Sequence, residues 1–454
     1  MPDAPGSREQ VEQLLDRIDT VDVHTNAVCT IHPDALGQAE ARDEEAAEGR
    51  SRGPLHGVPV LVKDNIDTHD LTTTAGSLAL ADVPNPSQDA ELVRRMREAG
   101  MVVLGKTNLS EWANIRDGMS TSGWSAYGGL TRNPYGLNRS AGGSSSGSGA
   151  AVAAGLARFA IGTETDGSIT CPAAFNGVVG IKPTVGLVPT DGVVPVARSQ
   201  DAPGPMATTV RDAAALLTVL AGDGTDYASH AVDGRLAGKR IGVPRKIYWG
   251  YSPHADAAAE RAVGLLAAEG AEIVDGADLT SMEDVGWEDE LLVLLAELRS
   301  GLGDYLATRP GDVPRSLEEV VAFNRDHADR ELEYFGQSLF DQALAGPAVG
   351  SQEYVAARAR CLRGRPRRGH RRRSPRARSR RAGHPVVRTG RADRPGQRRA
   401  PPRRVHAADG DGGIPARDGA LGTGRRAAGR GVVLGHGRER GDADRDRARL
   451  RVRA

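Results

Sequence analysis

The sequence predicts an α/β fold in which helices cover a β-sheet. Short apolar runs typical of buried strands occupy residues 58–63 and 101–107. A helical pattern that ends at a glycine occupies residues 89–100, between these two strands. Strands and helices that alternate along a chain are typical of a sheet covered by helices.

The remaining elements follow from the same periodicities. An amphipathic helix is predicted near the N-terminus, where apolar residues recur at helical spacing at Val11, Leu14, Leu15 and Ile18. Further helices are predicted at residues 149–156, 210–220 and 255–269, and further strands at residues 158–168 (running into a turn), 177–184 and 239–245. Residues 118–149 are dense in Gly, Ser, Thr and Asn, and so long a loop inside a compact domain is more often functional than idle.

The composition divides the chain into two unlike parts. The formal net charge is zero, yet the last lysine is Lys246 and about half of the 59 Lys and Arg residues are arginines after Cys361. Cys29, Cys171 and Cys361 fit neither a disulfide framework nor a zinc site, which favours a reducing, cytoplasmic location. The N-terminus lacks the layout of a signal peptide, and no apolar run is long enough to span a membrane.

A Gly-Ser tract is the first candidate for chemistry. Residues 142–149 read GGSSSGSG, which by itself is equally compatible with a plain linker. The alternative of a phosphate-binding P-loop fails, because no Gly-Lys-Ser/Thr sequence follows. A functional role for the tract is favoured once it is considered together with three other features. These are Lys63 at the end of its strand, GTETDGSI at residues 162–169 and CPAAFNGVVGIKPT at residues 171–184.

These motifs together resemble the amidase signature family of serine hydrolases, over roughly residues 55–220. The resemblance implies a twisted mixed sheet wrapped by helices on both faces. The sequence SGWSAYGG before the tract, with TETDGS after it, is most similar to bacterial peptide amidases and related general amidases. By this resemblance the catalytic triad is Lys63, Ser144 at a cis peptide bond, and the nucleophile Ser168.

The chemistry of amide hydrolysis requires these residue types. A serine hydroxyl becomes a good nucleophile only when a base takes its proton, and a lysine is a base only when neutral. The pKa of Lys63 must therefore fall from about 10.4 to roughly 7 to 8, which burial behind the apolar run before it would achieve. The hydroxyl of Ser144 can accept one hydrogen bond and donate another, so it can relay the proton between Lys63 and Ser168.

The resemblance also implies the rest of the site. The oxyanion hole would be formed by main-chain N–H groups of Thr165, Asp166, Gly167 and Ser168. Asp166 stands where many relatives have glycine, a pattern of the peptide-amidase branch. Hydrogen-bond partners of the triad are expected at Ser145 and Thr163, and substrate contacts at Gly118, Met119 and Ser120.

Simpler interpretations remain for single residues. Lys63 alone is most simply a solvated lysine at a strand end, and Cys171 is most simply a small buried filler. His56 and His69 show no metal-ligand spacing, so no metal and no cofactor are predicted. Trp124 and Tyr127 are equally compatible with a substrate pocket and with plain packing.

The resemblance breaks near Leu362. We expect a truncated amidase-signature domain at residues 1–361, while residues 362–454 are rich in Arg, Gly, Ala and Pro and can build no core. Suitable codons for residues 416–420, 426–431 and 448–454, read one base later, give Pro-Val-Thr-Val-Pro, Gly-Leu-Pro-Val-Gly and His-Ala-Tyr-Glu-Ser-Ala, which resemble family segments. We interpret this part as a frameshift product, which would leave the chain unstable and weakly active. The alternative, a basic tail that binds nucleic acid, is disfavoured because the tail has no lysine.

The predicted function is hydrolysis of a carboxamide C–N bond, giving a carboxylate and ammonia or an amine, through an acyl-enzyme on Ser168. The partner would be a small-molecule or peptide amide. Two alternatives stay open: the amidase component of a tRNA-dependent amidotransferase, and an inactive product with an arginine-rich tail. The acyl preference and the oligomeric state do not follow from the sequence.

Overall fold

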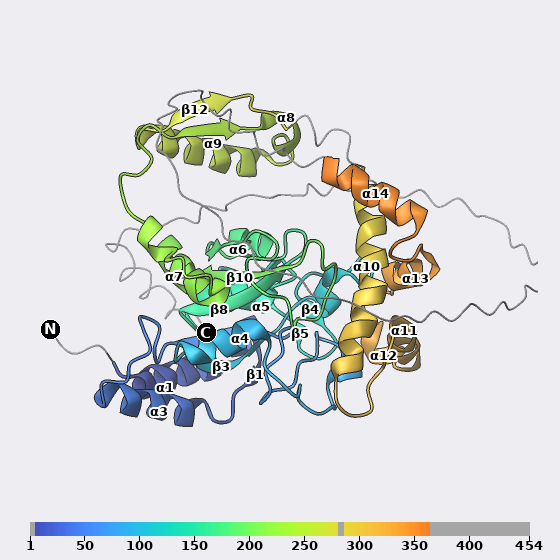
Figure 1. Ribbon diagram of the computed structural model, residues 1–454, viewed down its shortest axis with the longest axis horizontal. Helices are drawn as coiled ribbons and strands as arrows, with labels where there is room; N and C mark the ends of the chain where they lie inside the picture. Colours follow the sequence, from blue (N-terminus) through green and yellow to red (C-terminus); the bar gives the residue numbers. More distant parts are fainter. Residues whose placement is uncertain (1–4, 280–285, 364–454) are drawn as a thin grey trace, which may run out of the picture. The chain divides into compact units, whose positions relative to one another are not determined.

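A computed structural model of the protein describes residues 5–279 and 286–363. A β-sheet lies at its centre (Figure 1). This sheet has six strands in the order β1-β3-β2-β8-β10-β9. The strands are β1 (Val28–Ile31), β2 (Pro59–Lys63), β3 (Val102–Thr107), β8 (Phe159–Glu164), β9 (Val179–Gly180) and β10 (Ala202–Ala207).

The sheet is mixed, as expected. Strand β2 is parallel to both of its neighbours, β3 and β8. Strand β1 is antiparallel to β3, and β10 is antiparallel to β8 and β9. Every residue of β2, β3, β8 and β10 is buried, so these strands form the floor of the core.

Helices cover both faces of the sheet, which confirms the predicted α/β class. On one face, side chains such as Val60 and Phe159 pack against α4 (Glu91–Glu98) and α7 (Val210–Ala221). On the other face, Leu61 and its neighbours pack against four helices. These are α1 (Ser7–Arg17), α3 (Ala35–Ala47), α5 (Ser146–Ala154) and α6 (Thr170–Phe175).

A group of helices follows the sheet in sequence. It contains α10 (Trp287–Thr308), α11 (Leu317–Asp326), α12 (Ala328–Glu331), α13 (Ser338–Ala345) and α14 (Gln352–Arg363). Three of them, α10, α11 and α13, share a third hydrophobic core with segments that follow β2, β3 and β9. Buried polar contacts join these helices to the segments after β2 and β3. The Tyr305 hydroxyl donates to Asp67 at 2.8 Å, and the fully buried Arg116 pairs with Glu331 at 3.2 Å.

The remaining elements are short or peripheral. Strands β11 (Arg240–Val243) and β12 (Glu272–Asp275) form a parallel pair joined through α8 (Arg245–Tyr248) and α9 (Pro253–Ala268). Short strands are β4 (Trp124–Ser125), β5 (Gly129–Leu130), β6 (Arg132–Asn133) and β7 (Gly136–Ser140). Short helical turns are η1 (Ile18–Asp22), α2 (Val23–Thr25), η2 (Leu78–Leu80), η3 (Glu111–Asn114) and η4 (Ala228–His230).

Several sequence-based boundaries need correction. The strand predicted at residues 177–184 forms a strand only over Val179–Gly180, and the Ile181 N–H adds one further bond to the Pro205 carbonyl of β10. Helix α5 begins at Ser146, three residues before the predicted start at Gly149, because small residues let the first turn pack closely. The polar stretch at residues 118–149 is not wholly irregular, since it carries strands β4 to β7.

The predicted tail at residues 362–454 lies outside the described residues, except for Leu362 and Arg363, which complete α14. Helix α14 therefore crosses the predicted domain boundary by two residues. Within residues 5–279 and 286–363, no helix combines the length and the apolar character that a membrane span requires.

Candidate active site

Lys63 lies at the end of the central strand β2, and its side chain is fully buried. Its Nζ atom donates to the hydroxyl of Ser144 at 2.8 Å. It also donates to the hydroxyl of Thr163 at 2.8 Å and to the carbonyl of Thr163 at 3.3 Å. All three acceptors are neutral, so burial lowers the pKa of Lys63 to about 7, although Asp201 and Glu164 act in the opposite direction. A lysine with this pKa is partly neutral near pH 7.

Ser144 precedes the first turn of α5, and its side chain is fully buried. The Gly143–Ser144 peptide bond is cis, as the resemblance implied. The Ser144 carbonyl accepts from the N–H of Ser110 at 3.0 Å, which fixes the main chain at this point. The hydroxyl is thereby presented to Lys63.

Ser168 lies in the turn between β8 and α6, and 8% of its surface is exposed. The turn passes through Gly167 with a φ of +79°, a backbone conformation that suits glycine. The carboxylate of Glu164 accepts from the N–H groups of Ile169 and Thr170 at 2.8 Å each, which holds the far side of the turn. The Ser168 carbonyl accepts from the N–H of Ser145 at 3.1 Å, so the turn and the Gly-Ser tract are joined through the main chain.

Ser145 and Thr163 bind each other across the site. The Ser145 hydroxyl donates to the Thr163 carbonyl at 3.2 Å and accepts from the Thr163 N–H at 3.2 Å. The amide of Asn65 also donates to the Thr163 hydroxyl, at 3.0 Å. Thr163 therefore links the lysine, the tract and the segment after β2. Asn65 was not singled out from the sequence, although its place two residues after Lys63 was a usable signal.

The turn from Thr165 to Ser168 is anchored by a carboxylate that sequence reasoning missed. The Thr165 hydroxyl donates to the buried carboxylate of Asp201. This carboxylate also accepts from the N–H groups of Val196 and Ala197, at 3.0 to 3.1 Å. Asp201 follows RSQ and precedes APGP, and neither sequence marks it out.

The predicted substrate residues Gly118, Met119 and Ser120 lie in a separate loop. Met119 is 81% exposed, and its N–H donates to the carboxylate of Asp117 at 2.7 Å. The Ser120 hydroxyl donates to the Asp117 carbonyl at 2.8 Å, and the Gly118 N–H donates to the Ser338 hydroxyl at 3.4 Å. Within the described residues, their hydrogen bonds do not reach the lysine or the two serines. Their role in binding substrate stays a prediction.

A cavity of about 430 Å³ lies beside this loop, lined among others by Thr121, Trp124, Arg132, Arg330 and Tyr334. The ring of Trp124 also packs edge-on against Tyr334, with centroids 5.2 Å apart. Trp124 therefore lines a cavity and also packs against a neighbouring aromatic ring. The Tyr127 hydroxyl, in contrast, lies 3.4 Å from that of Thr30 and does not line this cavity.

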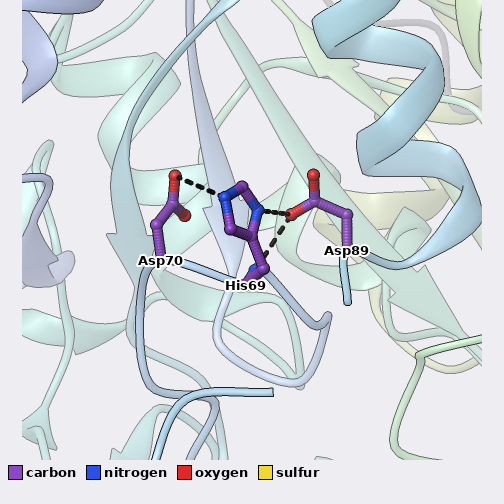
Figure 2. Close-up of side chains that lie close together, drawn as sticks. All are labelled: His69, Asp70 and Asp89. Carbon is purple, nitrogen blue, oxygen red and sulfur yellow. Dashed lines mark hydrogen bonds and ion pairs between the residues drawn. The ribbon is translucent and has the colours of Figure 1, made fainter. Parts of the chain in front are cut away.

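His69 lies close to two carboxylates, contrary to the impression given by its sequence spacing. Figure 2 shows its ring between Asp70 and Asp89, with Nδ1 at 2.9 Å from Asp89 Oδ1. Ligand atoms of the three side chains lie within 4.8 Å of one another, close enough to share a metal ion. The guanidinium of Arg97 already contacts both carboxylates, at 2.6 Å from Asp70 and 2.9 Å from Asp89. Both carboxylates of this cluster are thus already paired with an arginine.

Comparison with known proteins gives one consistent result. The amidase family model matches residues 9–337. A probable amidase from Arabidopsis thaliana is 40% identical over 372 residues, which covers 77% of this chain and 71% of the plant protein. A glutamyl-tRNA(Gln) amidotransferase subunit of Moorella thermoacetica is 44% identical over 278 residues, which covers 58% of this chain and 56% of the Moorella protein.

A solved structure agrees with the sequence matches. The peptide amidase of Stenotrophomonas maltophilia superimposes with a TM-score of 0.72 at 47% identity, covering 78% of this chain and 75% of the peptide amidase. The mixed sheet between two layers of helices and these matches define the class of protein as a hydrolase that acts on amides. The chain belongs to the amidase family.

Proposed function

We propose that the chain hydrolyses a carboxamide by a serine nucleophile that a buried lysine activates. The observation that carries this proposal is the pair of 2.8 Å hydrogen bonds from the Lys63 Nζ atom to neutral hydroxyls in a fully buried pocket. A lysine held in this way has a pKa of about 7 and can act as a base near neutral pH.

In the first step Ser168 attacks the amide carbonyl carbon. The Oγ–C bond forms while the hydroxyl proton passes through Ser144 to the Nζ atom of Lys63. The resulting oxyanion is stabilised by main-chain N–H groups of the Thr165–Ser168 turn. The anchoring of this turn by Glu164 and Asp201 supports that role, because preorganised donors need no rearrangement during the reaction.

The second half of the reaction reverses the proton path. The C–N bond breaks as the leaving nitrogen takes the proton from Lys63, and ammonia or an amine departs. Water then attacks the acyl ester on Ser168, with Lys63 again taking the proton. The products are a carboxylate and the free amine, and the return of the proton to Ser168 regenerates the enzyme.

The substrate class we propose is a small or peptide carboxamide, handled by this chain alone. The similarity to a peptide amidase over 78% of the chain supports this choice. The match to an amidotransferase component supports a second candidate, in which the same site releases ammonia for a partner enzyme. Turnover of a peptide amide by the isolated chain would favour the first candidate.

The cytoplasmic location stays a prediction from the sequence.

The proposal is tested with Ser168→Ala. We expect ammonia release from a C-terminally amidated peptide to fall to background, because no acyl-enzyme can form. Ser229→Ala is the matched control, because Ser229 is an exposed serine far from the site in sequence. The Ser229 hydroxyl donates to the Asp226 carbonyl at 2.7 Å. Equal ammonia release by the Ser168→Ala variant and the control would refute the proposal.

A further inference from the structure

Asp201 lies where strand β10 begins, directly opposite the turn that carries Ser168. In the antiparallel register, Ala202 pairs with Glu164, so the next pair along would join Asp201 with Thr165. Instead of a further strand pair, these two residues form a side-chain hydrogen bond, in which the Thr165 hydroxyl donates to Asp201 Oδ1. Strand pairing therefore brings a carboxylate to the first residue of the turn.

The carboxylate of Asp201 is buried, with 6% of the residue exposed. Burial of a carboxylate costs free energy unless donors compensate for the lost water. Here the donors are the Thr165 hydroxyl and the N–H groups of Val196 and Ala197. A buried acid with these donors is held firmly in place, yet it neither takes a proton nor touches a reacting atom in the proposed reaction.

Two electrostatic relations connect Asp201 with the reacting groups. Burial raises the pKa of Asp201 to about 6, and the carboxylate of Glu297 on α10 adds to this effect. Asp201 in turn favours the charged form of Lys63, as does Glu164 on β8. Within the described residues, the other carboxylates that act on these two groups are Glu164 on β8, for Lys63, and Glu297 on α10, for Asp201. Asp201 is therefore ionised near pH 7, when Lys63 must exchange its proton.

We propose that Asp201 is a positioning residue for amide hydrolysis: it holds the Thr165–Ser168 turn through the Thr165 hydroxyl and supplies a negative charge near Lys63. The inference rests on the proposed function of Lys63 and Ser168. It assigns two separable effects to one carboxylate. The first acts on the geometry of the turn and the second on the proton affinity of the lysine.

Variants at Asp201 and at Thr165 separate the effect on the turn from the effect on the proton affinity of Lys63. Asp201→Asn removes the charge and keeps an oxygen that can accept from Thr165. Thr165→Val removes the hydroxyl and keeps the charge, and Thr165→Ser restores the hydroxyl as a matched control. The readout is the rate at which a fluorophosphonate probe modifies Ser168 across pH 5 to 10, in the full-length chain. This covalent reaction requires the activated serine and does not depend on complete turnover.

For Asp201→Asn we expect the midpoint of the rising pH profile to move down by about one pH unit, because an opposite charge no longer favours the Lys63 ammonium. For Thr165→Val we expect the midpoint to stay and the rate to fall on the order of tenfold, with recovery in Thr165→Ser. A purely structural aspartate would not move the midpoint. An unmoved midpoint in Asp201→Asn, or a wild-type rate in Thr165→Val, would overturn the inference.

A separate variant distinguishes this outcome from failure of the proposed function. If Lys63→Met reacts with the probe at the wild-type rate and with the wild-type pH profile, the lysine is not the base, whatever Asp201 does. Melting curves of all variants show whether each is folded. If Asp201→Asn does not fold, the Thr165 variants still test whether the Thr165 hydroxyl holds the turn. A wild-type labelling rate in Thr165→Val would then overturn the proposal.

Discussion

Lys63 and Lys106 are both fully buried, on the adjacent parallel strands β2 and β3. Their partners differ. The Nζ atom of Lys106 lies 3.6 Å from the carboxylate of Asp64 and donates to the Ile66 carbonyl at 2.7 Å. The Nζ atom of Lys63 donates to neutral groups, and its nearest hydroxyls belong to Ser144 and Thr163. A buried ammonium without a carboxylate at contact distance loses its proton most easily, so Lys63 and not Lys106 is suited to act as a base.

The protonation of Lys63 predicts the pH dependence of activity. Its pKa is lowered to about 7, and only the neutral amine can accept a proton. The kcat/KM of the wild-type chain should therefore rise with pH and level off above pH 7. Lys63→Ala should lose most of this activity, by a factor of about 100 or more. Initial rates with a peptide amide from pH 5 to 9 test both expectations, and a flat wild-type profile with chemistry rate-limiting would contradict them.

The same lysine should make stability depend on pH. Burial lowers its pKa from the ordinary value of 10.5 to about 7 in the folded chain, so the unfolded state binds more protons between these values. Stability contributed at this site is therefore lost as pH falls from 10.5 to 7. The free energy of unfolding of the wild type should rise over this range relative to Lys63→Met, by about 1.4 kcal/mol per pH unit. Urea titrations at pH 7.5 and 9.5 give the difference, and parallel curves for the two proteins would contradict the low pKa.

At the scale of elements, the position of α5 decides whether Ser144 meets Lys63. The helix is built almost entirely from small residues, and all but one of its residues are buried. Gly147 in its first turn leaves no room for a side chain, because a Cβ atom there would lie 2.2 Å from the Ala27 carbonyl oxygen and 2.5 Å from the Asn108 carbonyl oxygen. The glycines of the Gly-Ser tract therefore allow close packing of α5, while its serines supply hydroxyl groups.

Gly147→Ala should push α5 away from the backbone of its neighbours. We expect a loss of about 1 to 3 kcal/mol in stability, the usual cost of overpacking, and a fall in activity because Ser144 moves with the helix. Gly264→Ala is the matched control, since Gly264 lies inside α9 and a Cβ atom added there would meet no atom of another segment within 4 Å. That change should be neutral or stabilise the protein by up to about 1 kcal/mol. Thermal unfolding of both variants makes the comparison, and equal stabilities would show that α5 does not pack as closely as described.

The elements also show how far local patterns predict this fold. Strands β2 and β3 were predicted from short apolar runs, as expected for buried parallel strands, and β8 was predicted as a strand that runs into the turn at Ser168. Strand β10 was not predicted, because APGPMA contains two prolines that argue against a central strand. It pairs nevertheless with β8 over six residues, since tertiary packing overrides the local preference. Asp201 was missed for the same reason.

At the scale of the whole molecule, the similarity to the amidase family ends before the arginine-rich segment. The family model stops at residue 337, and the chain spans 75% of the peptide amidase and 71% of the plant amidase. The abrupt change in composition near Leu362 is the basis for our proposal that the gene has shifted its reading frame there. Re-sequencing the gene around this codon tests it directly.

Restoring the frame should have measurable consequences. We expect a chain that continues from Leu362 in the frame one base later to unfold at a higher temperature and to turn over amides faster, because the family's remaining segments would cover apolar surface. The two chains share residues 1–361, so any difference arises after that point. Equal melting temperatures and equal rates for the restored and the present chain would contradict the frameshift.

The sequence by itself determined the family, the alternation of buried strands and helices, and the identity of Lys63, Ser144 and Ser168 as candidates. It could do so because continuous apolar runs and a rare combination of motifs are local properties. Only the tertiary structure decided that Lys63 has neutral partners while Lys106 has a carboxylate, and that Asp201 faces Thr165. Strand register and burial bring together residues that are distant in sequence, and the free energy of a charge depends on what surrounds it in space.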